Sequence, residues 1–257
     1  MGLFNKFDGN SPEFVALCER WDGYLKKLDE RYNEVIAQVE APMQGMIDGL
    51  QYDNIVVHNV LMGLENQTVT ELSEKVDQGW SKMQGEMEKL GAPWEVISSQ
   101  QKKGELFKNN MVDNFSDYHT NTYTRAANKI LENVQKHIDE KKLHRCTQCA
   151  GELPIKTYSF MAVNLKCESC GSVNTYQPDD RIRALEYYVI NQLAEANAKE
   201  LKKQARYDKN AGKEYYKAYY GYLMENVPDK KEFYERQMNE RIKWLDTNPF
   251  AGDYFRS

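Results

Sequence analysis

Two pairs of cysteines, each with two residues between them, constrain the fold of this chain most strongly. Cys146 and Cys149 form the first pair, Cys167 and Cys170 form the second, and 17 residues separate the pairs. This spacing is typical of four-cysteine zinc sites, in which each tight turn directs two thiolates at one ion. Four thiolates complete a tetrahedral shell and leave no open position for a substrate water. The sequence therefore predicts one structural Zn²⁺ per chain.

Other roles for these cysteines are a redox dithiol and structural disulfides. A cytosolic chain keeps its thiols reduced, and neither pair begins a helix after a predicted strand, as a thioredoxin-like site does. We therefore favour the metal. His144 replaces a cysteine ligand only if one turn is distorted, so we expect it to be solvent-exposed or to cap a helix. Three short strands are predicted near the site, at 153–160, 161–166 and 172–176.

The residues around the two pairs resemble a known family. The first pair continues as Cys-x-x-Cys-Ala-Gly-Glu-Leu, and the second lies within Leu-Lys-Cys-Glu-Ser-Cys-Gly-Ser-Val-Asn. Over residues 144–178 this pattern resembles the zinc-ribbon family. Gly171 matches the glycine that commonly follows a second knuckle, whereas the first knuckle has Ala150 there and Gly151 one place later. The resemblance implies a metal and a small β fold but no particular activity, because zinc ribbons occur in many unrelated proteins.

Residues 14–39 carry the clearest helical pattern. Ser, Pro and Glu at 11–13 are typical of a helix start, and an apolar heptad seam follows until Pro42. The seam predicts a long helix, either in an intramolecular bundle or in a coiled-coil homo-oligomer. Gly23 and the bulky aromatic residues on the seam favour the bundle. The seam consists of Phe14, Cys18, Trp21, Leu25, Leu28, Tyr32, Val35 and Val39.

Residues 43–67 mix Met and Gly with a short apolar run, and they predict an irregular or weakly helical connection. Residues 68–71 fit a capping box, and a helix with a buried, Met-rich face follows until Gly91 and Pro93 end it. We expect the Met-rich face to belong to the core.

The polar stretch 102–122 contains four asparagines, which favour a break or loop after a second helix start. Helical periodicity returns in residues 123–142. We expect this helix to be buried along an apolar stripe formed by Ala127, Ile130, Val134 and His137.

After the cysteines, Asp179 and Asp180 offer a helix cap, and the pattern predicts one long helix to about Arg206. A tyrosine-rich helix over 213–225 and a last helix from Pro228 follow. Since both ends of a ribbon lie on the side of its knuckles, we expect an antiparallel helical hairpin with the zinc module at its tip. The predicted fold is mainly α, a long-helix bundle or hairpin with an inserted small β zinc ribbon.

This organisation predicts three regions: helical 1–143, the ribbon 144–178, and helical 179–257, which packs with the first. Their net charges are −7, +1 and +1, within a total of −5. No long apolar stretch or secretory leader is present, so we expect a cytoplasmic protein without a membrane segment. A phosphate-binding role normally requires a basic domain, and only residues 199–217 approach one, with a local net charge of +4.

The basic and tyrosine-rich segment 199–222 is the predicted partner-binding face. Motifs for metalloproteases, nucleotide binding, serine hydrolases and di-iron bundles are absent, and four scattered histidines offer no catalytic grouping. We therefore expect a non-catalytic protein-interaction or assembly subunit; the alternatives are a nucleic-acid-binding protein and, less favoured, an enzyme without a recognisable motif. The candidate partner-binding residues are Lys202, Lys203, Arg206, Tyr215, Tyr216, Tyr219 and Tyr220.

Overall fold

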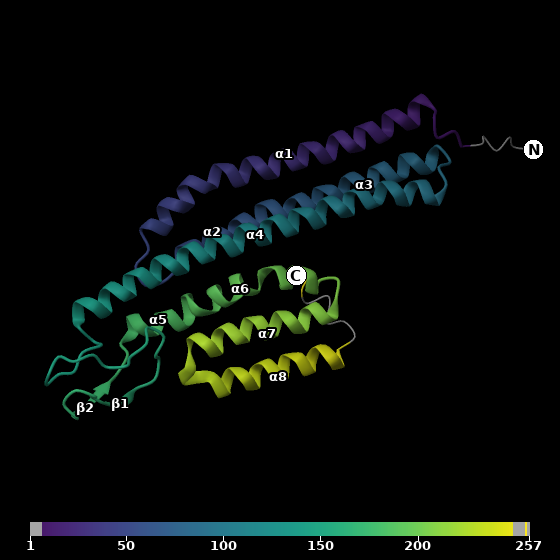
Figure 1. Ribbon diagram of the computed structural model, residues 1–257. Coiled ribbons are helices and arrows are strands. Elements are labelled where there is room, and N and C mark those ends of the chain that lie inside the picture. The colour runs from purple at the N-terminus through teal and green to yellow at the C-terminus, as the bar shows by residue number, and fades with distance from the viewer. Residues whose placement is uncertain (1–6, 249–254, 256–257) are drawn as a thin grey trace, which may run out of the picture. The chain divides into compact units, whose positions relative to one another are not determined.

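The computed structural model describes residues 7–248 and residue 255, and it is mainly α-helical with one small antiparallel sheet (Figure 1). The predicted fold class is thus confirmed. The elements are α1 (Pro12–Asp48), α2 (Ile55–Glu65), the π-helical turn η1 (Asn66–Thr70), α3 (Glu71–Lys89), α4 (Trp94–Lys141), β1 (Val163–Lys166), β2 (Val173–Tyr176), α5 (Asp180–Tyr188), α6 (Ile190–Ala205), α7 (Lys209–Asn226), the 3-10 turn η2 (Pro228–Lys230) and α8 (Lys231–Thr247).

The chain divides into two compact units. The first contains the described residues up to Gly45 together with His58–His119. The second contains Met46–Val57 and the described residues from Thr120 onward, so the ribbon and the C-terminal helices belong to one unit with the end of α4.

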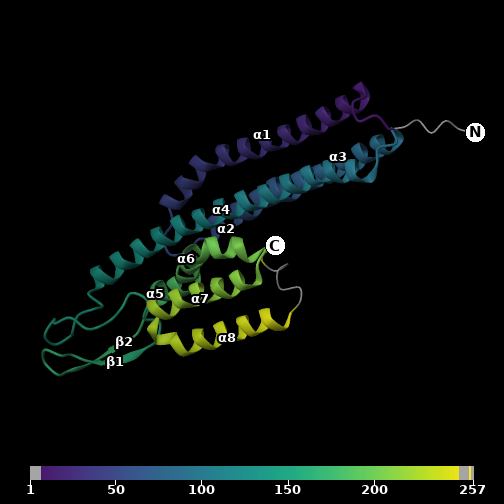
Figure 2. The same cartoon turned by 45° about the vertical axis from the view of Figure 1, so that its right-hand side comes forward.

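The heptad seam of α1 is buried inside the first unit. Its residues pack in one core with side chains of α3 and of the first part of α4, and Figure 2 shows these three helices side by side, as Figure 1 does. The seam thus packs within the chain, as the bundle interpretation requires. The buried members of this core are Phe14, Leu17, Trp21, Leu25, Leu28, Tyr32, Val35, Leu64, Leu72, Val76, Met83, Met87, Ile97, Met111 and Phe115.

Three boundary predictions in the N-terminal half were wrong. Pro42 does not end α1, because Met43 and Ile47 beyond it are both buried and offset the one hydrogen bond that a proline removes. Residues 43–67, predicted to form an irregular or weakly helical connection, are non-helical only at 49–54. The capping box at 68–71 does not form, because the Oγ1 of buried Thr68 donates to the Leu64 carbonyl at 2.6 Å inside the π-helical turn.

The predicted break in 102–122 is also absent, since α4 runs through it without interruption. The four asparagines that suggested a loop are all exposed, whereas Met111 and Phe115 of the same stretch are buried. Burial of one apolar face outweighs the weak helix propensity of the solvent-facing residues.

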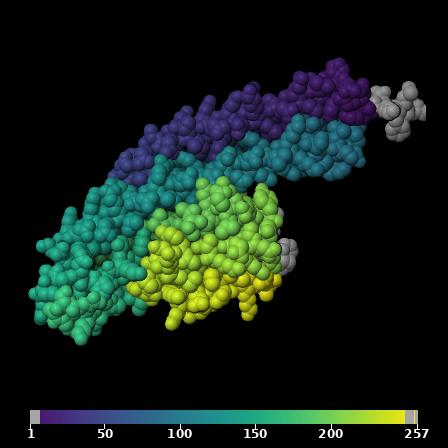
Figure 3. Space-filling model, in the orientation of Figure 1, coloured from purple at the N-terminus to yellow at the C-terminus, as the bar shows by residue number. Residues whose placement is uncertain are grey.

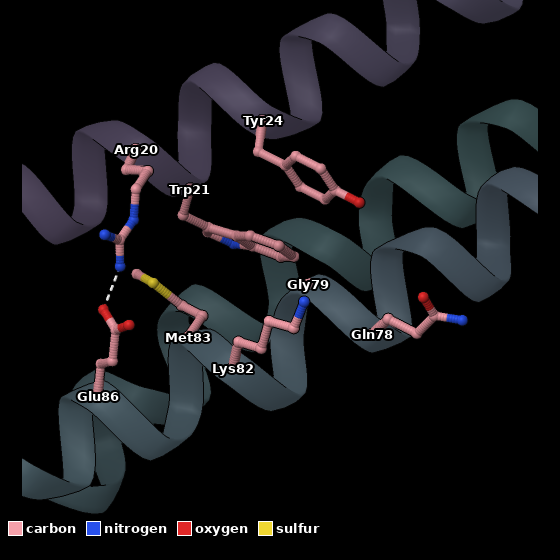
Figure 4. A pocket seen from close by; sticks show the side chains of 8 residues that line it. All are labelled: Arg20, Trp21, Tyr24, Gln78, Gly79, Lys82, Met83 and Glu86. Atoms are coloured by element: carbon pink, nitrogen blue, oxygen red, sulfur yellow. Dashed lines mark hydrogen bonds and ion pairs between the residues drawn. The ribbon is translucent and has the colours of Figure 1, made fainter.

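Trp21 is closely packed in the core of the first unit. Only 2% of its surface is exposed, and its Nε1 donates to the carbonyl of Gln100 on α4 at 3.1 Å. The indole lies against two glycines: a Cβ on Gly79 of α3 would approach it within 3.2 Å, and one on Gly104 of α4 within 3.0 Å. Figure 4 shows Trp21 and Tyr24 reaching from α1 toward Gly79. The two glycines therefore allow the helices to accept this ring.

In the second unit, the chain reverses direction after α4. His137 of α4 contacts Asp179 just before α5, and Asn121, earlier in α4, accepts a hydrogen bond from Lys199 of α6. The contact that lies earlier in α4 is made by the residue that lies later in the chain, so the two arms run antiparallel. The predicted hairpin is therefore present, and the cysteine module joins the end of α4 to the start of α5 (Figure 1).

The single helix predicted to Arg206 is instead two helices, α5 and α6, divided at Val189. Val189 and Ile190 at this break are both fully buried. The capping role predicted for Asp179 is confirmed, because its carboxylate accepts from the N–H groups of Arg181 and Ile182 at 3.0 and 3.2 Å.

We predict that Gly79→Ala destabilises the protein. Its Cβ would lie 2.6 Å from Cε1 of Tyr24, a ring that cannot easily retreat because its hydroxyl donates to the Lys75 carbonyl. The expected loss in the free energy of unfolding is about 1–3 kcal/mol. Gly85→Ala on the same helix is the matched control, because its Cβ meets nothing within 4 Å; it should stabilise by about 0.5–1 kcal/mol. Urea denaturation of both variants measures the difference, and equal effects would contradict the close fit around Trp21.

Candidate metal centre

The four cysteines predicted to bind zinc meet at one point. Their sulfur atoms all lie within 4.8 Å of one another, with Cys146 Sγ 3.7 Å from Cys170 Sγ and Cys149 Sγ 3.6 Å from Cys167 Sγ. A tetrahedral Zn²⁺ with Zn–S bonds of about 2.3 Å places its ligand atoms about 3.8 Å apart. The spacing of the sulfurs, and the soft thiolate chemistry of all four donors, therefore fit a closed zinc site.

The two knuckles have the same backbone hydrogen bonds. In the first, the N–H of Cys146 donates to the Gly151 carbonyl at 2.7 Å, and the N–H of Ala150 donates to the Cys146 carbonyl at 2.9 Å. In the second knuckle, the N–H of Cys167 donates to the Ser172 carbonyl and the N–H of Gly171 donates to the Cys167 carbonyl, both at 2.8 Å.

The residue after each second cysteine has a positive φ, 58° at Ala150 and 76° at Gly171. The alanine in the first knuckle thus adopts the left-handed conformation that glycine adopts in the second. The shift of glycine to position 151 does not change the turn. It places a residue without a side chain where a Cβ would lie 2.9 Å from Ser169 Oγ and 3.3 Å from Cys149 Sγ.

Short strands hold the knuckles in place. The second knuckle is the turn of the β1–β2 hairpin, whose last pair, Lys166 with Val173, directly precedes and follows it. The first knuckle is closed by an isolated bridge between Arg145 and Glu152. The strand predicted at 153–160 is absent; this segment is a loop that packs its buried Phe160 under the Nζ of Lys230. Lys230 also pairs with Glu186 of α5, which attaches the loop to the C-terminal helices.

Two polar residues that the sequence did not single out surround the sulfurs. The Ser172 Oγ lies 3.1 Å from the sulfurs of both Cys146 and Cys170. Asn174, which is buried, donates from Nδ2 to Cys146 Sγ at 3.5 Å and accepts from the N–H of Thr147 at 3.0 Å. The only sequence signal for them was their place directly after the second pair.

Hydrogen bonds and neighbouring sulfurs shift the pKa values of the cysteines in opposite directions. The Ser172 hydroxyl and the N–H of Cys149 lower the pKa of Cys146 to about 5. At Cys149 the N–H of Gly151 favours the thiolate, but the sulfurs of Cys170 and Cys167 outweigh it and raise the pKa to about 12. Four thiolates at this spacing therefore require a cation among them, and the +2 charge of zinc would supply it.

Among the residues that the structure describes, the grouped metal-ligating side chains are these four cysteines. His144 is half-buried and outside the group; its carbonyl accepts from the N–H of Leu153 at 2.7 Å. The fifth cysteine, Cys18, is partly buried on the first unit's seam, and burial raises the pKa of its thiol.

A second cluster of polar residues fixes the two arms of the hairpin, and sequence reasoning placed its central residue only in an apolar stripe. His137, 5% exposed, contacts the Asp179 carboxylate through Nε2 at 2.6 Å, and Arg181 donates to its Nδ1 at 3.0 Å. Nδ1 is therefore the acceptor and Nε2 carries the proton. Tyr52 packs edge-on against the imidazole and under the Arg181 guanidinium.

The candidate partner-binding residues lie in the core of the C-terminal helices or at its edge. Arg206, Tyr215 and Tyr216 are buried. The Arg206 Nε donates to the Phe255 carbonyl at 2.9 Å, and Tyr215 donates to Glu195 at 2.6 Å. Tyr219 and Tyr220 are half-buried, and Tyr219 donates to Asn191 of α6 at 3.0 Å.

The lysines of the same segment are paired with acids. Lys202 pairs with Glu195 and Lys203 lies 3.8 Å from Glu200, and both lysines are half-buried. Further along, Lys213 and Lys217 pair with Asp246 and Glu214 at 2.6 and 2.7 Å. The sequence showed a local excess of positive charge, but folding brings acids from α6 and α8 to it.

No family model matches the chain, and no curated protein or solved structure matches it significantly. In the described part of the chain, every helix is too short or too polar to cross a membrane.

We predict that Cys167→Ser abolishes zinc binding and unfolds residues 144–178 while most of the helix content remains. A module this small depends on its metal, whereas the long helices have apolar cores of their own. Elemental analysis of the natural protein should give one zinc per chain, and far-UV circular dichroism should show little change in the variant. Global loss of helix would instead show that the ribbon is integral to the bundle.

We also predict that Ala150→Gly strengthens zinc binding, because glycine adopts the positive φ at this position without strain. The expected gain is about 1 kcal/mol, or about fivefold in affinity. Gly171→Ala introduces the same strain in the equivalent turn and should weaken binding by a similar factor. Competition with a chromogenic chelator measures both; equal affinities in the two variants would contradict the equivalence of the knuckles.

Proposed function

We propose that this chain is a non-catalytic, zinc-containing assembly subunit that binds a protein partner. Its structural zinc ribbon closes the tip of a helical hairpin and gives that end a fixed shape. The observation that carries the proposal is an open groove beside the ribbon that is bordered by two exposed apolar side chains and by charged residues.

The groove lies within the second unit and has a volume of about 710 Å³. It is bordered by Met161 of the ribbon loop, Glu186 of α5 and the residues of the α7–α8 corner. Met161 and Phe233 are 51% and 47% exposed, so both present apolar surface to solvent at the groove. Figure 3 shows the surfaces of the ribbon and of the C-terminal helices adjoining one another on this side of the unit. Methionine and phenylalanine together form an adaptable apolar surface of the kind that protein partners use.

The charges of the groove favour a protein over a polyanion. Three acids and three bases border it, so their charges cancel. Lys230 is already paired with Glu186, and the Arg236 guanidinium lies over the Phe233 ring at 5.7 Å. The groove is therefore suited to an apolar side chain of a partner segment, with charged groups at the rim for its polar backbone and neighbours.

Nucleic-acid binding is the alternative, and the pairing of the basic segment argues against it. Affinity for phosphates comes from cations that become neutralised on binding, and four of the lysines between 199 and 217 are already neutralised by Glu or Asp. A zinc with four thiolates adds a further −2 at the ribbon. An enzyme is the less favoured alternative: both ring nitrogens of His137 are engaged, which leaves neither to transfer a proton to a substrate.

The test compares partner binding by three full-length chains expressed in the native cell, purified with and without nuclease. We expect one protein to co-purify in defined stoichiometry despite the nuclease, and to be lost when Met161→Ser and Phe233→Ser are combined. Tyr207→Ser is the matched control, because Tyr207 is 74% exposed and does not border the groove.

A second measurement addresses the alternative directly, with single- and double-stranded DNA and RNA at two salt concentrations. Micromolar or tighter binding at physiological salt, lost when Lys202, Lys203 and Arg206 are changed together to Glu, would overturn the proposal. Retention of the co-purifying protein by the Met161/Phe233 variant would show that the groove is not its binding surface.

A further inference from the structure

We propose that His137 is a proton-sensitive latch: a proton taken up at its Nδ1 expels Arg181, which then no longer holds Tyr52 against α5. The inference concerns the polar cluster that fixes the two arms of the hairpin. It depends neither on the metal centre nor on the groove proposed for a partner. It makes the attachment of the α1–α2 connection to α5 dependent on pH.

The latch holds a segment that is distant from α5 in sequence. Tyr52 lies in the non-helical connection between α1 and α2, and Met46–Val57 belongs to the second unit although the chain on both sides of it belongs to the first. Asn133 of α4 fixes the start of this connection, because its Nδ2 donates to two backbone carbonyls there at 2.8 and 2.9 Å. Further along, the Arg181 guanidinium lies 5.3 Å from the centre of the Tyr52 ring. Arg181 therefore adds a second attachment.

The two ring nitrogens of His137 have opposite roles in this cluster. A guanidinium only donates hydrogen bonds, so the Arg181 nitrogen that lies 3.0 Å from Nδ1 requires an unprotonated Nδ1. Nε2 carries the proton and donates to the Asp179 carboxylate at 2.6 Å. The closed latch is therefore the neutral imidazole with its proton on Nε2.

Protonation reverses the contact at Nδ1 and leaves the contact at Nε2 intact. The imidazolium has an N–H on each nitrogen, so at Nδ1 two positively charged donors would face one another at 3.0 Å. The bond from Nε2 to Asp179 persists and is strengthened by the charge. His137 is 5% exposed and is held by this bond, whereas Arg181 is an exposed residue with a long side chain. Arg181 is therefore the group that moves.

The neighbouring ionisable groups keep their charges between about pH 5 and pH 8, where histidine side chains titrate. Partial burial raises the pKa of Asp179, but the hydrogen bonds from His137 and from backbone N–H groups outweigh it, so the pKa is lowered. Burial and the Asp179 charge raise the pKa of Tyr176 of β2 to about 12. A guanidinium stays protonated throughout. Further charged residues on the elements that meet here are exposed, namely Asp53, Lys136, Glu140, Lys141, Asp180, Arg183 and Asp229.

The imidazolium cannot take the place of Arg181 over the Tyr52 ring. The two ring centroids of His137 and Tyr52 lie 6.5 Å apart, with the imidazole edge-on. A cation is attracted to an aromatic face within about 6 Å of its centroid, which the guanidinium satisfies and the imidazole does not. Release of Arg181 therefore removes the attachment between α5 and Tyr52.

The test is a double-mutant cycle on the full-length protein, with Arg181→Met, Tyr52→Leu and both together. Urea denaturation gives the unfolding equilibrium constant of each chain at about pH 7.5 and pH 5.5, on either side of ordinary histidine titration. We expect the two substitutions to be coupled by about fivefold in this constant at the higher pH and uncoupled at the lower pH. Zinc content is measured at each pH, because metal affinity falls as thiolates are protonated.

Two controls separate the latch from other effects of pH. His137→Gln offers an amide with one donating and one accepting group to the same neighbours but takes up no proton. In this background the coupling should persist at both pH values, whatever happens to the zinc. Arg183→Met replaces an exposed arginine two residues further along α5 and should show no coupling to Tyr52→Leu at either pH.

Equal coupling at both pH values in the natural background would overturn the latch, and so would a coupling that disappears at the lower pH in the His137→Gln background as well. If His137→Gln does not fold, the imidazole titration followed by nuclear magnetic resonance decides. Removing Arg181 should let His137 take up its proton at a higher pH than in the natural protein, because the opposing cation is gone. An unchanged titration midpoint in Arg181→Met would refute the proposal.

Discussion

Convergence of four sulfur atoms on one point determines how the second unit is arranged. Each knuckle closes through the same two backbone bonds, and the strands, a bridge on one side and a four-residue pair on the other, are too short to be stable alone. A metal held by the four cysteines would therefore help to bring the end of α4 and the start of α5 together. Once that distance is set, α5 and α6 return along α4, and the rest of the C-terminal helices pack onto α6 and α7.

The polar cluster at the base of the ribbon reinforces this reversal. Asp179 caps α5 with one carboxylate oxygen and contacts His137 of α4 with the other, so one side chain connects both arms. The hydrogen bond from His137 and the two N–H groups lower the pKa of Asp179, although partial burial opposes them. The carboxylate thus stays charged, as a cap and partner of this kind requires. The cysteine group and the Asp179 cluster lie at neighbouring points where the chain reverses direction.

The first unit depends on shape rather than on charge. Its three helices bury one continuous apolar seam, and Trp21 occupies the space left by a glycine on each of two facing helices. This fit favours packing within one chain over association of identical helices, because the tryptophan and the two glycines lie on three different helices. The surface beside this fit is lined by charged residues, including the pair of Arg20 and Glu86 (Figure 4).

The sequence by itself determined the grouping of the four cysteines, the mainly α fold with a small β insert, and the faces of the long helices, because each follows from local spacing: two residues between cysteines, or steps of three and four along a helix. Tertiary structure decided what depends on distant residues. Asn109 and Asn110 weaken a helix locally, yet α4 continues because Met111 and Phe115 are buried against other helices. The lysines near 202 are basic in sequence, yet acids from other turns and other helices neutralise them. The contacts of the Ser172 hydroxyl with the sulfurs of Cys146 and Cys170 likewise depend on how the two knuckles meet, which no spacing of cysteines specifies.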